Sequence, residues 1–138
     1  MTLDADVVRS RCSEIERALD RLDLIREGGR LAFLANDDSK DIACYRLLIA
    51  IEAALALCYH VSARALREVP EDYAGCFASL ERGSLIDADL SARLQQMARF
   101  RNLLVHVYWT VDYDQVFAIL ERRLGDLRAF SRAMAGLL

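Results

Sequence analysis

Three side chains that can take part in catalysis lie close together in the chain: Arg101, His106 and Tyr108. An imidazole accepts and returns a proton near neutral pH, which suits it to general acid–base catalysis. A guanidinium keeps its positive charge and can hold two phosphate oxygens through parallel hydrogen bonds. His106 and Arg101 together therefore indicate chemistry on a phosphate ester, in which His106 moves protons and Arg101 stabilises negative charge.

RNA cleavage without a metal is one reaction that these two groups can support. The substrate's own 2′-hydroxyl attacks the adjacent phosphorus, so the protein must supply proton transfer and stabilise the charged phosphorane. His106 suits the first task and Arg101 the second. No acidic cluster that would bind magnesium lies near these residues, so we expect neither a metal nor another cofactor.

Two further polar residues are candidates for the same site. Asn102 has a supporting role in this interpretation, either orienting the imidazole or donating to a phosphate. Glu52 interrupts an apolar stretch, where an unpaired carboxylate would be costly to bury, so it needs a partner. It either forms a structural pair with a buried arginine or positions the guanidinium of Arg101 in the catalytic cleft.

The spacing Arg-x4-His-x-Tyr over residues 101–108 resembles the motif of the HEPN superfamily, and within it the HepT-like toxins of prokaryotic toxin–antitoxin pairs. Phe100 before the arginine, the Leu-Val-His of residues 104–106 and the later Asp112 also look like that family's sequence. Val107 departs from it, because a small or polar residue is expected after the histidine.

The resemblance implies a homodimeric, metal-independent ribonuclease that cleaves RNA, with tRNA as one candidate. It implies that Arg101 and His106 are catalytic, and that a partner nucleotidyltransferase antitoxin attaches AMP to Tyr108. The added phosphate would bring negative charge and bulk to the place where RNA phosphate binds. Tyr108 is therefore expected to be the off switch of the site.

Two other functions are open. The same bundle could be a catalytically inactive module that binds a nucleotide or a protein partner, or a purely structural helical dimer. The net charge of −3 leaves the first of these open, since a strongly basic domain is typical of nucleic-acid binding. Any RNA site must be a local feature of this surface.

The composition predicts one compact helical domain over residues 1–138. Hydrophobic residues make up 54% of the 138, with one proline and six glycines, which leaves little room for linkers or disordered tails. The most apolar stretch, residues 42–61, carries Arg46, Glu52 and His60, so we expect no membrane span.

The four cysteines, at positions 12, 44, 58 and 76, lack the short spacing of a zinc knuckle or redox loop. We expect them to be reduced residues of the core. With no signal peptide recognised, the interpretation is a cytoplasmic protein.

Apolar residues recur at helical spacing nearly throughout, and no alternating stretch predicts a strand. The pattern predicts an all-α antiparallel bundle of about five helices around one long central helix. The expected helices cover residues 4–26, 38–66, 71–82 after Pro70, 87 to the motif, and 112–135, with a short turn at 31–35.

Helical geometry separates the two catalytic candidates. A five-residue step places Arg101 and His106 about 140° apart around a straight helix, whereas Asn102 shares a face with His106. Either the helix breaks near residues 105–109, or Arg101 of one subunit works beside His106 of another.

Overall fold

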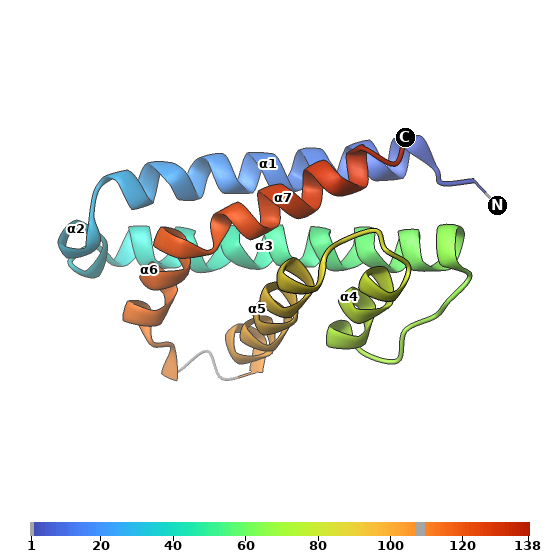
Figure 1. Cartoon of the computed structure of the whole chain (residues 1–138). Helices are drawn as coiled ribbons and strands as arrows, with labels where there is room; N and C mark the ends of the chain where they lie inside the picture. Colours follow the sequence, from blue (N-terminus) through green and yellow to red (C-terminus); the bar gives the residue numbers. More distant parts are fainter. Residues whose placement is uncertain (1, 107–109) are drawn as a thin grey trace.

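The computed structural model describes residues 2–106 and 110–138, and within them it is all-α, as predicted. No strand occurs in this part of the chain. Figure 1 shows an antiparallel bundle in which the chain passes from one end to the other and back. The elements are α1 (Ala5–Glu27), α2 (Arg30–Leu34), α3 (Asp37–Val61), the π-helical η1 (Ser62–Leu66), α4 (Tyr73–Arg82), α5 (Ala88–His106), α6 (Tyr113–Arg122) and α7 (Leu124–Ala135).

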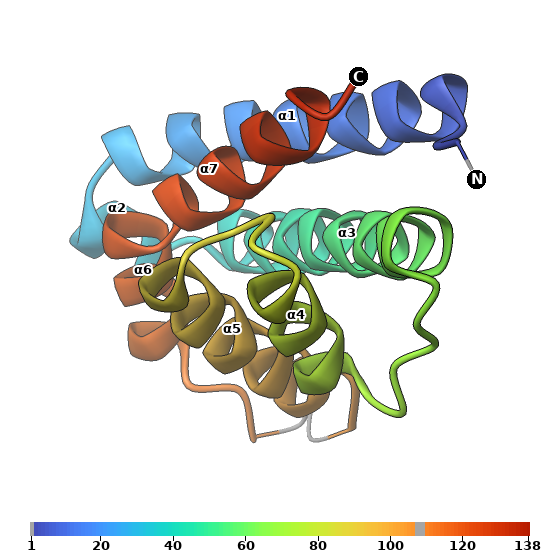
Figure 2. The ribbon, with the colours of Figure 1, turned by 45° about the vertical axis from the view of Figure 1, so that its right-hand side comes forward.

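The long central helix of the prediction is α3. Helices α1 and α7 lie along one side of it, and α4 and α5 cross the other side (Figures 1 and 2). Buried residues therefore surround its axis, among them Leu47, Ala50, Ala54 and Leu57. Alanine at several of these positions leaves room for neighbouring helices to pack closely.

By length and composition alone, the helix Asp37–Leu66 could cross a membrane. Half of its most apolar window is buried inside the protein, however, and the core helix of a soluble protein meets the same criteria. Its place at the centre of the bundle explains its hydropathy without a membrane.

Two helix starts differ from the prediction. The cap of α3 is Asn36, whose Oδ1 accepts from the backbone N–H of Ser39 at 3.1 Å, so the helix begins before residue 38. Pro70 does not open α4. That helix begins at Tyr73, because Asp72 adopts an extended conformation and accepts from the N–H of Gly75 at 2.6 Å.

The single C-terminal helix of the prediction is wrong. Asp112 caps it as expected, accepting from the N–H groups of Asp114 and Gln115 at 3.0 and 3.3 Å. The helix then ends at Arg122, and α7 begins at Leu124 beside Gly125, a residue of low helix propensity. The break turns α7 back along α1 and α3.

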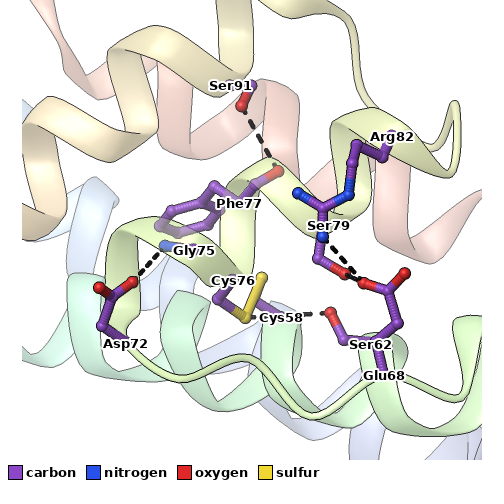
Figure 3. The surroundings of a disulfide bond; sticks show 10 residues. All are labelled: Cys58, Ser62, Glu68, Asp72, Gly75, Cys76, Phe77, Ser79, Arg82 and Ser91. Atoms are coloured by element: carbon purple, nitrogen blue, oxygen red, sulfur yellow. Dashed lines mark hydrogen bonds and ion pairs between the residues drawn. A yellow bond between two sulfur atoms is a disulfide. The ribbon is translucent and has the colours of Figure 1, made fainter.

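The four cysteines do not all stay reduced in the structure. Cys58 of α3 and Cys76 of α4 form a disulfide with a Cα–Cα distance of 6.2 Å (Figure 3). Cys12 and Cys44 are free and partly buried. Spacing in the sequence did not predict this pair, because the two cysteines, 18 positions apart, meet only after η1 and the loop that follows it bring α4 back against α3. The bond ties α4 to the central helix.

Candidate functional site

Arg101 extends from α5 into the junction with α3 and α4. Its Nε donates to Oε1 of Glu52 on α3, and its Cζ lies 4.8 Å from the ring centroid of Tyr73 on α4. Its Nη1 also donates to Oδ1 of Asn102 at 3.2 Å. Only 15% of the Arg101 side chain is exposed. Three elements therefore fix this guanidinium.

Glu52 does pair with an arginine, and that arginine is the motif's. We expected a buried carboxylate, but the Glu52 side chain is 43% exposed and Arg101 is the more buried partner. The carboxylate thus neutralises a largely desolvated cation. Both roles predicted for Glu52 are compatible with this contact.

Tyr73 is a site residue that the sequence reasoning missed. A cation over an aromatic face is attracted by the negative charge of the ring surface. Tyr73 is held in turn by Tyr59 of α3, with ring centroids 6.2 Å apart in an edge-to-face arrangement. Burial, together with the neighbouring Tyr73 and Asp72, raises the pKa of the Tyr59 phenol. No motif signalled these aromatics, since they lie far from Arg101 in the sequence.

His106 is the last residue of α5, and its side chain is exposed. The helix is continuous from Ala88 to His106, so no break occurs between Arg101 and His106. Within one chain, Arg101 turns toward α3 and α4 while His106 stands on another face. The structure brings Arg101, Glu52 and Asn102 together and leaves His106 on a different face of α5 from Arg101.

Asn102 lies between the two halves of the motif. It is exposed, on the same helical face as His106, and its amide oxygen accepts from Arg101. Its amide nitrogen is the group that can still donate, either to a phosphate or to the imidazole.

Tyr108, the expected modification site, lies outside the described residues, as do Val107 and Trp109. The chain is described again from Thr110, and Asp112 caps α6. The described part of the motif, from Arg101 to His106, forms the end of α5 as its bounds are described, and α6 begins at Tyr113.

An apolar surface adjoins the motif. Two hollows share Leu104 and Val111; one is also lined by Tyr45 and Leu48, the other by Leu103. Tyr45 is 58% exposed and Leu103 is 50% exposed. We call these five residues the motif-end surface. Large apolar side chains gathered in this way mark an interaction site more often than isolated exposed ones do.

Known proteins are similar to this chain in sequence and in fold. The chain matches the family model described as Ribonuclease HepT-like over residues 15–134. It is 24% identical over 125 residues to the mRNA nuclease HepT of Shewanella oneidensis, a match that covers 91% of this chain and 93% of that protein.

Two solved structures illustrate the likeness of fold. The tri-AMPylated HEPN toxin of Shewanella oneidensis, in complex with MNT antitoxin, has a TM-score of 0.87 at 23% identity, over 95% of this chain and 98% of that chain. The Bacillus subtilis cytosolic protein YutE, of unknown function, has a TM-score of 0.85 at 13% identity, over 97% and 90%. Because the family model spans most of its length, the chain belongs to the HepT-like ribonuclease family.

Proposed function

We propose that this protein is a metal-independent ribonuclease and the toxin of a toxin–antitoxin pair. The observation that carries the proposal is the guanidinium of Arg101, held by Glu52 and Tyr73 on the same short stretch of α5 as the exposed His106. A cation fixed in this way is preorganised for a charged transition state.

In the proposed reaction, the substrate's 2′-oxygen attacks the neighbouring phosphorus and the bond from phosphorus to the 5′-oxygen breaks. His106 accepts the 2′-hydroxyl proton, and a proton is returned to the departing 5′-oxygen. Arg101 stabilises the negative charge on the phosphorane oxygens. The products are a 2′,3′-cyclic phosphate and a 5′-hydroxyl end, and no metal takes part.

We propose that the active unit is a homodimer. In one chain the Arg101 guanidinium and the His106 imidazole occupy different faces of α5, so a single cleft needs a second copy of this helix. The motif-end surface, whose Leu103 and Leu104 lie between the two residues in the sequence, supplies exposed apolar area for such a contact. Packing these surfaces together would place Arg101 near the partner's His106.

The proposed partner is a nucleotidyltransferase antitoxin that attaches AMP to Tyr108. The solved relative in complex with MNT antitoxin is a tri-AMPylated toxin, which supports the same partnership here. Tyr108 lies two residues after His106, so a phosphate attached there would repel the substrate phosphate.

The proposed substrate is RNA, in a cytoplasmic setting. The name of the Shewanella relative favours mRNA, and tRNA is a second candidate from the family resemblance. The cytosolic description of YutE supports the compartment.

The test is an RNA cleavage assay in excess chelator with unmodified protein. Arg101→Ala and His106→Ala should each lower the rate by at least about 100-fold. Arg17→Ala, which removes an exposed arginine of α1, is the control and should cut RNA normally. A folded, unmodified parental protein that cuts no RNA would refute the enzyme and leave the inactive binding module as the function.

The antitoxin proposal has a separate test, the intact mass of the protein after co-expression with its nucleotidyltransferase. Added AMP that peptide mapping locates on Tyr108 is the expected result. AMP attached to a different residue would refute Tyr108 as the modified position.

A further inference from the structure

A cavity of about 250 Å³ lies between α5 and the α6–α7 junction, outside the contacts described so far. On the α5 side it is lined by one helical face that includes Met97 and Phe100, and Ile119 faces them from α6. These side chains give the cavity an apolar floor. Its volume is just below the roughly 300 Å³ of pockets that bury a drug-sized ligand, so it suits part of a nucleotide, such as the base, with the remainder at the surface.

Three arginines line the same cavity: Arg93, Arg122 and Arg123. The buried Asp126 holds one of them, its Oδ1 accepting from Arg93 Nε at 2.8 Å, and its Oδ2 forms a longer ion pair with Arg123 Nη1 at 3.9 Å. Arg122 is exposed and makes no ion pair within the described part of the chain. Asp89 and Asp87 also act on Arg93, so the positive charge that no ion pair neutralises in this described part of the chain is that of Arg122, on a protein whose net charge is −3.

The apolar floor and the arginines of the cavity indicate which chemical groups it can bind. An apolar floor accepts the flat face of a base, while guanidinium groups bind a phosphate through paired hydrogen bonds. Two side-chain amides, Gln96 and Gln115, also line the cavity and can donate to or accept from a base edge. A cavity that can bind the face of a base, the edge of a base and a phosphate has the groups needed to bind a nucleotide.

The cavity lies on the same helix as the motif. Around the α5 axis, Arg99 stands about 20° from His106 and about 60° from Gln96 at the cavity wall. Gln96 and His106 are separated by about 15 Å along the axis, a few nucleotides of extended chain. Arg99 is exposed, so a path of polar and basic side chains leads from His106 to the cavity.

We propose that this cavity binds one nucleotide of a single-stranded RNA substrate, a few nucleotides away from the cleaved bond. The proposal rests on the ribonuclease function for its substrate class. It assigns to Arg122, Arg93 and Arg123 the binding of a phosphate, and to Met97, Phe100 and Ile119 the contact with its base.

The test measures binding without cleavage, in protein carrying His106→Ala. A fluorescently labelled single-stranded RNA hexamer is titrated by anisotropy, with 5′-AMP and adenosine as competitors. Adding Arg122→Ala should weaken hexamer binding by about tenfold or more, the usual effect of losing a charge-assisted phosphate contact. Arg17→Ala, an equal loss of charge on α1, should leave binding unchanged. 5′-AMP should compete better than adenosine, because adenosine lacks the phosphate.

A second variant probes the cavity itself. Ala118 lines it from α6, and Ala118→Glu would add a carboxylate among the guanidiniums. Hexamer binding should fall with this variant while thermal unfolding stays that of the parental protein.

Three results would overturn the proposal: no hexamer binding at all, equal weakening by Arg122→Ala and Arg17→Ala, or an Arg122→Ala effect on antitoxin binding alone. The last result would make the cavity a protein contact. Since binding is read in a protein that cannot cleave, a failure of the ribonuclease proposal is seen separately, as loss of RNA cutting by the parental protein with hexamer binding intact.

Discussion

Replacing Glu52 with glutamine tests whether the carboxylate positions Arg101 for catalysis. The amide can still accept from Arg101 Nε, so the change removes the charge and keeps the shape of the contact. A hydrogen bond to a charged group contributes about 1.5–3 kcal/mol and a neutral one about 0.5–1.5 kcal/mol. The middles of the two ranges differ by about 1.2 kcal/mol, which corresponds to nearly a tenfold change in rate if it is felt in the transition state.

We therefore expect Glu52→Gln to lower kcat for RNA cleavage by about tenfold, with a smaller change in KM. Thermal unfolding should fall by only a few degrees, since about 1 kcal/mol shifts Tm by about 3–5 °C in a chain of this length. Glu16→Gln is the matched control, because Glu16 pairs with Arg128 at 3.6 Å and its side chain is 40% exposed, far from the motif.

The kinetic assay uses a defined RNA under single-turnover conditions, with circular dichroism to confirm folding. A folded Glu52→Gln protein that cleaves at the parental rate would reject the positioning role and leave a structural ion pair. Equal slowing by Glu16→Gln would reject it too, because the effect would then follow general stability.

Three further outcomes follow from the structure. Tyr73→Leu should slow cleavage by about fivefold, since a cation–π contact is worth about 1 kcal/mol, while Tyr73→Phe should match the parental rate; equal loss in both variants would contradict this. In denaturant without reductant, thiol titration should find two free cysteines per chain, and four after reduction; four at the outset would disprove the Cys58–Cys76 bond. Hydrogen bonds from Ser79 and then from Arg82 lower the pKa of the Glu68 carboxyl. The charged carboxylate therefore stabilises the folded protein fully above the ordinary pKa of a glutamate, and this contribution is lost as the pH falls through the lowered pKa. Glu68→Gln should therefore reduce Tm more at pH 7 than at pH 3, and equal losses at both would contradict the assignment.

Helix content and the burial of α3 were predictable because both follow from the local spacing of apolar residues in the sequence. The helix starts were harder. Asn36, Asp38 and Asp41 all carry plausible capping side chains, and only the tertiary position of the chain selects the first. The break between α6 and α7 was missed for a similar reason, since Gly125 alone is often tolerated within a helix.

The surroundings of Arg101 were only partly predictable. Glu52 drew attention because a carboxylate in an apolar stretch needs a partner. Tyr73 gave no comparable signal, because it reaches Arg101 only after the loop following η1 returns α4 to the bundle. A motif identifies the reactive groups, whereas the residues that hold them come from elements that contact only in the folded state.

The two halves of the motif are supported differently, and this bears on the proposed inhibition. Arg101 is fixed by α3 and α4, while His106 ends α5 with an exposed side chain. Tyr108 follows His106 by two residues in the sequence, so we propose that a group attached there acts on the substrate bound at the histidine, with the Glu52–Arg101 pair retained. Inhibition would then come from blocking substrate and repelling its phosphate, with the bundle left folded. Removing AMP would then restore activity without refolding.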